Sequence, residues 1–230
     1  MNKLPSLTAV ILAAGRGRRM GSEINKVFLD MAGSCVLNHS LTRLSEASFV
    51  GQIVVVINHE DRDLVKERLG YDFSRTGPIE LVEGGERRQD SSLAGVERAT
   101  SEYVLVHDAA RPNFSIRLVK DLFDAARDNG SALPGISPVD TIRSVTDGEV
   151  GSTLDRDSLI RVQTPQCFRR EILLESLRAA TDREDYFTDD VAVVMAEKGI
   201  RPALVEGERG NIKLTRPLDF RLLESLLSKD

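Results

Sequence analysis

Short apolar runs alternate with amphipathic stretches along most of the chain. Buried strands are predicted where β-branched residues cluster, at residues 8–12, 52–57, 79–83, 103–107 and 132–136. Apolar residues at helical spacing predict helices at residues 36–47, 61–69, 91–99 and 115–129, with Asp90 as the expected N-cap of the helix at 91–99. Strands that alternate with helices in this way are typical of a mostly parallel sheet with helices on both faces.

The pattern changes after Pro138. Residues 139–163 are polar and alternating, and Asp147-Gly148 is typical of a hairpin turn. We expect this segment to be an arm, because it has too few large apolar residues to pack within the sheet. Helices return at 169–179 and 188–198, followed by a strand at 202–206 and a last helix from Pro217. The predicted fold is α/β: one domain over residues 1–230 with a Rossmann-like, mostly parallel sheet and a projecting β-hairpin arm.

Composition narrows the classes of function. The chain has 230 residues, of which 41% are hydrophobic and 29% are charged, and its net charge is −5. This acidic balance argues against general binding to nucleic acid or to a membrane surface. We find no apolar run of bilayer-spanning length and no signal-peptide pattern, and Cys35 and Cys167 are too far apart for a metal motif or a disulfide framework. We therefore expect a cytoplasmic protein without nucleic-acid or membrane partners.

The first predicted strand ends in a loop of small and positively charged residues. The carboxyl end of such a strand faces the ligand crevice of an open α/β sheet. Small residues leave backbone N–H groups open to a ligand, and nearby cations suit a polyphosphate. The small residues are Ala13, Ala14, Gly15 and Gly17, and the cations are Arg16, Arg18, Arg19 and Lys26. A Walker A loop would continue with Gly-Lys-Ser/Thr, and a dinucleotide fingerprint would have glycine at Met20. The competing interpretation is a solvated basic turn.

These residues carry a family resemblance. AAGRGRRM (13–20) with Lys26 resembles the signature of nucleotidyltransferases that join a nucleoside triphosphate to a phosphorylated sugar or polyol, and most of all the 2-C-methyl-D-erythritol 4-phosphate cytidylyltransferases. Further matches follow in the family's order: GGERRQDS (84–91), VHDAARP (106–112), DT (140–141), DR (155–156), TPQ (164–166), TDD (188–190) and NIKLTRP (211–217). The chain departs from the family at Asn25, where proline is usual, and at Glu86, where aspartate is common.

The resemblance implies that a phosphate monoester attacks the α-phosphorus of CTP and expels pyrophosphate, with no protein nucleophile. It implies catalytic roles for Arg19, Lys26 and Lys213 in holding the triphosphate and stabilising the transition state. The implied nucleotide-binding residues are Ala13, Ala14, Gly15, Gly17, Gly84, Gly85, Glu86, Ser91 and Asp108, and Asp108 also serves Mg²⁺ or another divalent cation. The implied polyol-phosphate site comprises Arg111, Asp140, Thr141, Arg156 and Thr164. In relatives the arm interlocks with a second subunit, which implies a homodimer.

Plainer interpretations compete with several of these roles. Asp108 also fits a cap for the following turn, Gly84-Gly85 a simple turn, and Arg156 a surface charge run. His107 fits a packed, hydrogen-bonded neighbour better than a catalytic base, and the Asp-Arg-Asp triplet at 61–63 fits a helix start. Three other functions stay open at this point: a ribitol 5-phosphate cytidylyltransferase, which tends to have glycine at Ala14 and a valine within DAARP, a D-x-D glycosyltransferase, and a non-catalytic nucleotide-binding protein.

Overall fold

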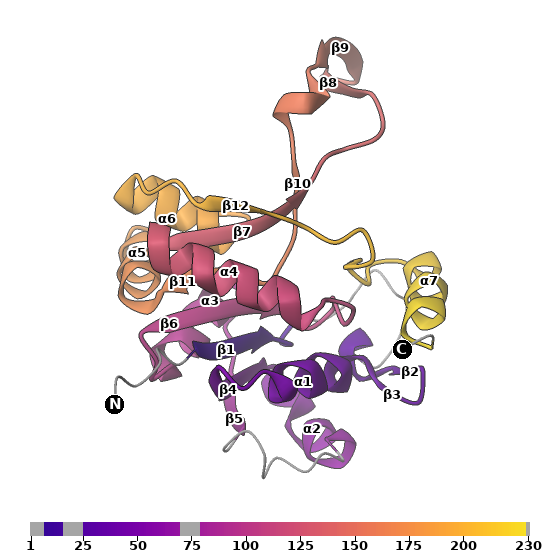
Figure 1. The fold of residues 1–230 in the computed structure, drawn as a ribbon, viewed down its shortest axis with the longest axis vertical. Coiled ribbons are helices and arrows are strands. Elements are labelled where there is room, and N and C mark those ends of the chain that lie inside the picture. The colour runs from indigo at the N-terminus through magenta and orange to yellow at the C-terminus, as the bar shows by residue number, and fades with distance from the viewer. Residues whose placement is uncertain (1–6, 16–24, 70–78, 229–230) are drawn as a thin grey trace.

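The computed structural model of the protein describes residues 7–15, 25–69 and 79–228. Its main sheet has eight strands in the order β10-β7-β11-β6-β1-β4-β5, and β12 pairs with β7 (Figure 1). These strands are β1 (Leu7–Leu12), β4 (Val50–Ile57), β5 (Ile79–Glu83), β6 (Tyr103–Asp108), β7 (Ser131–Ile136), β10 (Arg161–Val162), β11 (Gln166–Arg169) and β12 (Ala203–Glu206). β1, β4, β5 and β6 form parallel pairs, whereas β10 and β11 run antiparallel to their neighbours. The predicted α/β fold with a mostly parallel sheet is confirmed.

Helices cover both faces of the sheet. They are α1 (Val36–Glu46), α2 (Arg62–Arg68), α3 (Arg88–Arg98), α4 (Ile116–Asn129), α5 (Arg170–Asp182), α6 (Asp190–Lys198) and α7 (Pro217–Leu227). Short 3₁₀ turns occur at Lys26–Phe28, His59–Asp61 and Arg156–Ser158, and a small hairpin is formed by β2 (Asp30–Met31) and β3 (Ser34–Cys35). None of the helices in the described ranges is long and apolar enough to cross a membrane.

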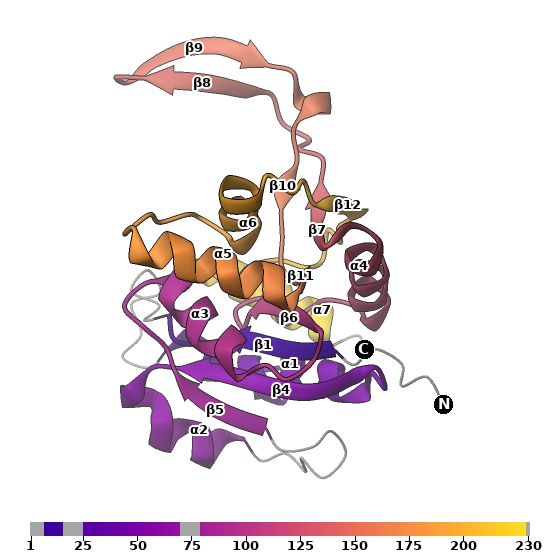
Figure 2. The ribbon, with the colours of Figure 1, turned by 90° about the vertical axis from the view of Figure 1, so that its left-hand side faces the viewer.

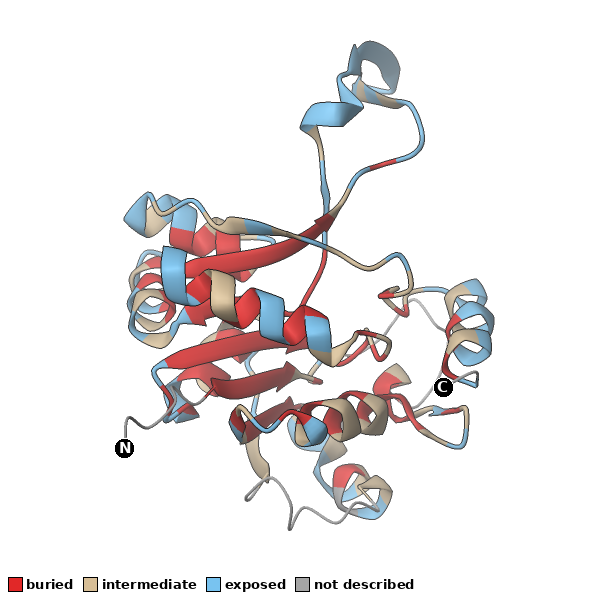
Figure 3. Ribbon diagram, viewed as in Figure 1, coloured by how far each residue is buried: buried red, intermediate tan, exposed pale blue. Residues whose placement is uncertain are grey.

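The central strands β1, β4 and β6 are buried on both sides, and their alternate residues serve two separate cores. On β1, Ala9 and Ile11 pack with α1, α4 and α7, whereas Val10 packs with α3, α5 and α6. Figure 3 shows the strands of the body as a buried layer between helices whose outer faces are exposed. Continuous apolar runs such as Ile53–Ile57 follow from this burial, because neither side of the strand meets water.

Helix α3 begins earlier than predicted and packs against the sheet through a glycine. It starts at Arg88, so Asp90 lies in its first turn, and the Asp90 carboxylate accepts the backbone N–H of Arg87 at 3.0 Å. The prediction of Asp90 as the N-cap is therefore wrong by three positions. Gly95 faces the sheet, and a Cβ built there would lie 2.3 Å from Cγ1 of Val10. The missing side chain lets the helix carrying Arg88 approach β1 and β4.

The arm is a two-stranded hairpin that projects from the body (Figures 1 and 2). β8 (Ile142–Thr146) pairs with β9 (Glu149–Leu154), and Asp147 and Gly148 form the turn with positive φ angles of 51° and 84°. The predicted hairpin turn is confirmed, since both residues tolerate this conformation. Within the predicted segment 139–163, Arg161 and Val162 form β10 and pair with β7 in the main sheet.

Two strands of the main sheet, β10 and β11, escaped prediction. β11 lies between β6 and β7 and runs antiparallel to both of them. Its four residues QCFR are too short for a periodic signal, and Cys167 and Phe168 are completely buried. The nearby Thr164 lies beside the end of β6, where its hydroxyl accepts the Asp108 N–H at 3.1 Å.

Candidate active site

A cleft of about 980 Å³ opens at the carboxyl ends of β1, β4, β5 and β6. From β1 the sheet continues with β4 and β5 on one side and with β6 on the other. The carboxyl end of β1 is therefore the topological switch point, where open α/β sheets bind ligands. The cleft is lined by Leu12, Ala13, Ala14, Gly15, Lys26, Val27, Asn58, His59, Gly84, Gly85, Glu86, Arg87, Arg88, Ser91, Asp108, Ala110 and Lys213. Four of these side chains are basic and two are acidic, which favours an anionic ligand.

The end of β1 is held in place by backbone and side-chain hydrogen bonds. The Ala13 N–H donates to the Val56 carbonyl at 2.7 Å. The Asn25 amide donates to the Ala13 carbonyl and to Oδ2 of Asp61, each at 2.9 Å. Asn25, which stands where the family usually has proline, thus ties the start of the Lys26 turn to the end of the first strand. Asp61 belongs to the triplet assigned to a helix start, and it directly precedes α2.

Gly84 lies where three parts of the cleft meet. Its N–H donates to the Ile57 carbonyl at 2.9 Å. A Cβ at this position would lie 2.6 Å from Oγ of Ser91 and 2.7 Å from Cβ of Ala14. A larger residue would push apart segments that the resemblance assigns to nucleotide binding. Gly84 is therefore more than a turn residue, because close approach requires it.

Asp108 ends β6 between two cations. Its Oδ2 accepts a hydrogen bond from Nζ of Lys213 at 2.6 Å, and its Oδ1 accepts one from Nε of Arg88 at 3.2 Å. Burial alone would raise the pKa of Asp108, but the charges of Arg88 and Lys213 outweigh it and hold the pKa well below its usual range. The carboxyl group is therefore ionised at neutral pH. These contacts replace the interpretation of Asp108 as a turn cap.

Arg88 continues the charge network beyond the cleft. Its Nη1 donates to Oδ2 of Asp190, the first residue of α6, at 2.8 Å. Burial alone would lower the pKa of Arg88, but the charges of Asp190 and Asp108 raise it above its ordinary value. Arg88 lies in the motif GGERRQDS and Asp190 in the motif TDD, but the sequence predicted no role for either residue. The available signal was an arginine at a helix start, three residues after a glycine pair.

His107, Thr164 and Arg111 form a hydrogen-bonded layer next to Asp108. The Asp108 N–H donates to Oγ1 of Thr164 at 3.1 Å, and Nδ1 of His107 lies 3.3 Å from the same oxygen. Nε2 of His107 lies 2.9 Å from the Arg111 carbonyl. Burial lowers the pKa of His107 to about 4, so the ring is neutral near pH 7. This supports the prediction of a packed, hydrogen-bonded histidine.

The segment 211–217 crosses beside residues 110–112 and brings Lys213 to the cleft. The Leu214 N–H donates to the Ala110 carbonyl at 2.8 Å, and Nη1 of Arg111 donates to the Asn211 carbonyl at 2.8 Å. Asn211 is completely buried and donates to the Thr164 carbonyl at 2.8 Å. Residues separated by about a hundred positions are thereby joined into one wall, which sequence spacing does not reveal.

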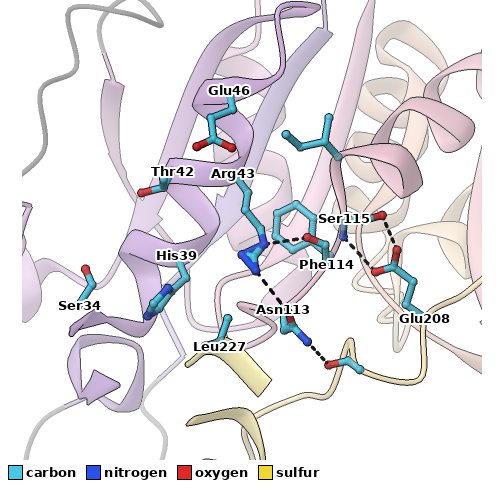
Figure 4. Close-up of a pocket in the computed structure, with 12 residues that line it drawn as sticks. Ser34, His39, Thr42, Arg43, Glu46, Asn113, Phe114, Ser115, Glu208 and Leu227 are labelled. Atoms are coloured by element: carbon cyan, nitrogen blue, oxygen red, sulfur yellow. Dashed lines mark hydrogen bonds between the residues drawn. The ribbon is translucent and has the colours of Figure 1, made fainter. Parts of the chain in front are cut away.

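A second hollow of about 600 Å³ lies between α1, the loop before α4 and the C-terminal part of the chain (Figure 4). Its polar groups bond to one another: Nε of Arg43 donates to the Phe114 carbonyl at 3.0 Å, and Glu208 accepts from the N–H and hydroxyl of Ser115. These contacts join α1 to the start of α4. We assign this hollow a structural role.

The chain matches a family and several known proteins. The family model of 2-C-methyl-D-erythritol 4-phosphate cytidylyltransferase matches residues 7–229. A relative of that name from Bacillus licheniformis is 37% identical, and the match covers 96% of this chain and 95% of the relative. Another, from Syntrophus aciditrophicus, is 34% identical, and the match covers 98% of this chain and 97% of the relative. This chain belongs to the 2-C-methyl-D-erythritol 4-phosphate cytidylyltransferase family.

Solved structures agree with this family. The 4-diphosphocytidyl-2C-methyl-D-erythritol synthase of Anaerococcus prevotii superposes with a TM-score of 0.83 at 29% identity, covering 97% of this chain and 98% of that one. The 2-C-methyl-D-erythritol 4-phosphate cytidylyltransferase of Thermus thermophilus gives 0.79 at 31% identity, covering 96% and 98%. Membership of the cytidylyltransferase family sets aside the glycosyltransferase alternative.

The residues that the family resemblance selected fall into four groups. Those that line the cleft are Ala13, Ala14, Gly15, Lys26, Gly84, Gly85, Glu86, Ser91, Asp108 and Lys213. Arg111 and Thr164 lie next to Asp108 through backbone hydrogen bonds. Asp140, Thr141 and Arg156 are exposed on the arm. Gly17 and Arg19, with Arg16 and Arg18, lie outside the described residues.

The Asn25 junction yields a first test. Asn25→Asp replaces the amide donor with a second carboxylate beside Asp61 and the Ala13 carbonyl. We expect the free energy of unfolding at pH 7 to fall by about 1–3 kcal/mol, because buried acceptors lose their donor. The KM for CTP should rise as well, since the end of β1 is released. Urea denaturation and steady-state kinetics measure the two effects.

The double variant Asn25→Asp/Asp61→Asn is the control for this test. It restores a donor between the two side chains but not the bond to the Ala13 carbonyl, so stability should recover in part. Wild-type stability in the single variant would show that the Asn25 amide does not hold this junction.

Proposed function

We propose that this protein transfers the cytidylyl group of CTP to 2-C-methyl-D-erythritol 4-phosphate, releasing pyrophosphate and forming 4-diphosphocytidyl-2-C-methyl-D-erythritol. The observation that carries the proposal is the cationic cleft at the carboxyl edge of the sheet, where Lys26, Lys213 and Asp108 meet the end of β1 in a member of this family. Ala14 and the DAARP stretch favour the erythritol substrate over ribitol 5-phosphate.

The chemistry asks the protein for positioning and charge stabilisation. The attacking oxygen belongs to a phosphate monoester that is already anionic, so no general base is needed. Negative charge grows on the α-phosphate oxygens and on the leaving pyrophosphate, and fixed cations stabilise it. In our proposal Lys26 and Lys213, with Arg19, supply these cations. The neutral, buried His107 takes no proton in this scheme.

Asp108 suits a divalent cation. Mg²⁺ commonly binds one or two protein carboxylates together with substrate phosphates and water. Asp108 offers one ionised carboxylate at the cleft, and the described residues contain no cluster of three acidic, histidine or cysteine ligands that would form a cage without phosphates. The donor set therefore fits an ion shared with the triphosphate. When bound, the ion supplies positive charge to the phosphate oxygens, while Asp108 orients it.

The activity itself is tested by pyrophosphate release. Purified protein with CTP and Mg²⁺ should release pyrophosphate when 2-C-methyl-D-erythritol 4-phosphate is present. We expect much slower release with ribitol 5-phosphate, because Ala14 and the DAARP stretch follow the pattern of the erythritol enzymes. Faster release with ribitol 5-phosphate would overturn the assigned acceptor, and release with neither would overturn the reaction.

The two lysines provide a test of mechanism. Lys26→Ala and Lys213→Ala should each lower kcat on the order of 100- to 1,000-fold, the loss typical of removing one contact to a developing oxyanion. Circular dichroism should show that both variants remain folded. Lys120→Ala, which removes an exposed lysine paired with Asp124 on α4, is the control and should keep full activity. Wild-type kcat in both cleft variants would contradict the mechanism.

The arm lies far from its own cleft and presents apolar residues to solvent. Val145 and Val150 are 65% and 69% exposed, and Val139 and Ile160 at the base of the arm are also exposed. No residue of 139–160 is among the described residues that line the cleft. An isolated hairpin is marginally stable in water, so we propose that the arms of two copies pack together in a two-fold dimer. Arg156 and Thr141 then serve the acceptor site of the partner subunit.

Mixed dimers test whether Arg156 acts on the partner. Arg156→Ala and Lys26→Ala dimers each have two defective sites. A mixed dimer has one site with an intact Lys26 and an intact Arg156, so it should recover about one-half of wild-type activity. Differently tagged subunits, co-expressed and purified through both tags, provide the mixed dimer. Activity no higher than that of the two parent variants would show that Arg156 acts within its own subunit.

A further inference from the structure

Arg88 occupies a junction of three elements that the reaction scheme above leaves unused. It is the first residue of α3, and its guanidinium reaches the Asp108 carboxylate at the end of β6 and the Asp190 carboxylate at the start of α6. The Arg88 side chain is 26% exposed, that of Asp108 11% and that of Asp190 1%. The arginine therefore bridges a cleft residue and a buried one.

The bridge uses different nitrogens for the two carboxylates. Nε contacts Oδ1 of Asp108 at 3.2 Å, and Nη1 contacts Oδ2 of Asp190 at 2.8 Å. A guanidinium has a planar, rigid set of donors that can hold two groups in a set geometry, which a lysine ammonium lacks. Because Oδ1 of Asp108 is occupied by Arg88, Oδ2 is the oxygen that faces Lys213 at 2.6 Å.

The charges are arranged so that Asp108 stays available. Asp190 is nearly completely buried and counterbalances the positive charge of Arg88. Arg88 can therefore orient Asp108 without neutralising it, which leaves the Asp108 charge to Lys213 or to a cation. A buried ion pair adds little net stability because its desolvation offsets its attraction. The arrangement is better explained by orientation than by folding energy.

Neighbouring residues fix Arg88 in turn. The Gln89 side chain donates to the Asp185 carbonyl at 3.0 Å and accepts the Phe187 N–H at 3.1 Å. The Arg87 guanidinium lies 3.2 Å from the centre of the Tyr186 ring. Arg87, Arg88 and Gln89 thus all contact the segment 185–190, which leads into α6. The start of α3 is locked to α6, so the direction of the Arg88 side chain is set before any ligand arrives.

We propose that Arg88 is a positioning residue for nucleotide binding: anchored by Asp190, it holds the Asp108 carboxylate with one oxygen directed at Lys213 and at the cation of the CTP complex. This role rests on the proposed cytidylyl transfer and deepens it, since it explains what orients the cleft carboxylate. The acceptor residues keep their positions without this bridge, because Arg156 and Thr141 lie on the arm, and Arg111 and Thr164 are held by the backbone groups of Asp108 rather than by its carboxylate.

The test compares two variants with a matched control. Arg88→Lys keeps the positive charge but replaces the two nitrogens that bind Asp108 and Asp190 by a single ammonium nitrogen. Arg88→Met/Asp190→Asn removes the buried pair together, so no uncompensated buried charge remains to unfold the chain. Arg178→Met is the control, because it breaks the exposed ion pair of Arg178 with Glu97, which also joins α5 to α3 but lies away from the cleft.

Calorimetry of CTP with Mg²⁺ and without acceptor gives a readout independent of turnover. Both Arg88 variants should raise the dissociation constant about 10- to 100-fold, the loss typical of removing a partner that orients a metal-binding group. In kinetics, kcat/KM for CTP should fall to a similar extent while the KM for the acceptor stays unchanged. The control should match the wild-type protein in all three quantities.

The outcomes separate the positioning role from the proposed reaction. Wild-type affinity for CTP with Mg²⁺ in either folded Arg88 variant would overturn the positioning role. An equal rise of both KM values, or the same loss in Arg178→Met, would also overturn it in favour of a general structural effect. Failure of the wild-type protein to release pyrophosphate, with CTP binding still weakened in both Arg88 variants, would overturn the proposed function and leave the positioning role standing.

Discussion

The carboxylate of Asp108, held between Lys213 and Arg88, is the interaction around which the cleft is arranged. It draws together the end of β6, the start of α3 and the C-terminal segment 211–217, which are far apart in the sequence. Burying a carboxylate is costly unless cations and hydrogen bonds compensate for the lost water. One of the compensating cations, Lys213, is also a residue that the proposed reaction assigns to the triphosphate, so the same charge would serve both Asp108 and the substrate.

Close approach is the second constraint on the cleft. Gly95 lets α3 pack against β1 and β4, and Gly84 lets the end of β5 lie against Ala14 and Ser91. The first contact brings α3, which carries Arg88, close to the sheet, and the second brings the end of β5 against two residues of the proposed nucleotide site. Both depend on a missing side chain rather than on a reactive group. The shape of the cleft is therefore set by backbone packing at these two glycines.

The arm divides the proposed active site between two kinds of structure. The nucleotide side is built on strand ends within a close-packed body, whereas Asp140, Thr141 and Arg156 are carried on an exposed hairpin. In the proposed dimer, acceptor binding depends on assembly and nucleotide binding does not. The β10 pairing with β7 anchors the base of the arm to the sheet, so its direction is set by the body even though its tip is exposed.

The sequence by itself determined most of the elements and the order of strands and helices, because buried parallel strands and amphipathic helices have strong periodic signals. It also placed Lys26, Gly84 and Asp108 in one cleft through their motifs. Three features were decided by tertiary structure alone. β11 is too short to show a period, β10 is a two-residue strand that forms by pairing with β7, and Arg88 meets Asp190 across 102 positions. Such contacts depend on how strands and helices pack in three dimensions. Local sequence patterns carry no information about which distant residues meet.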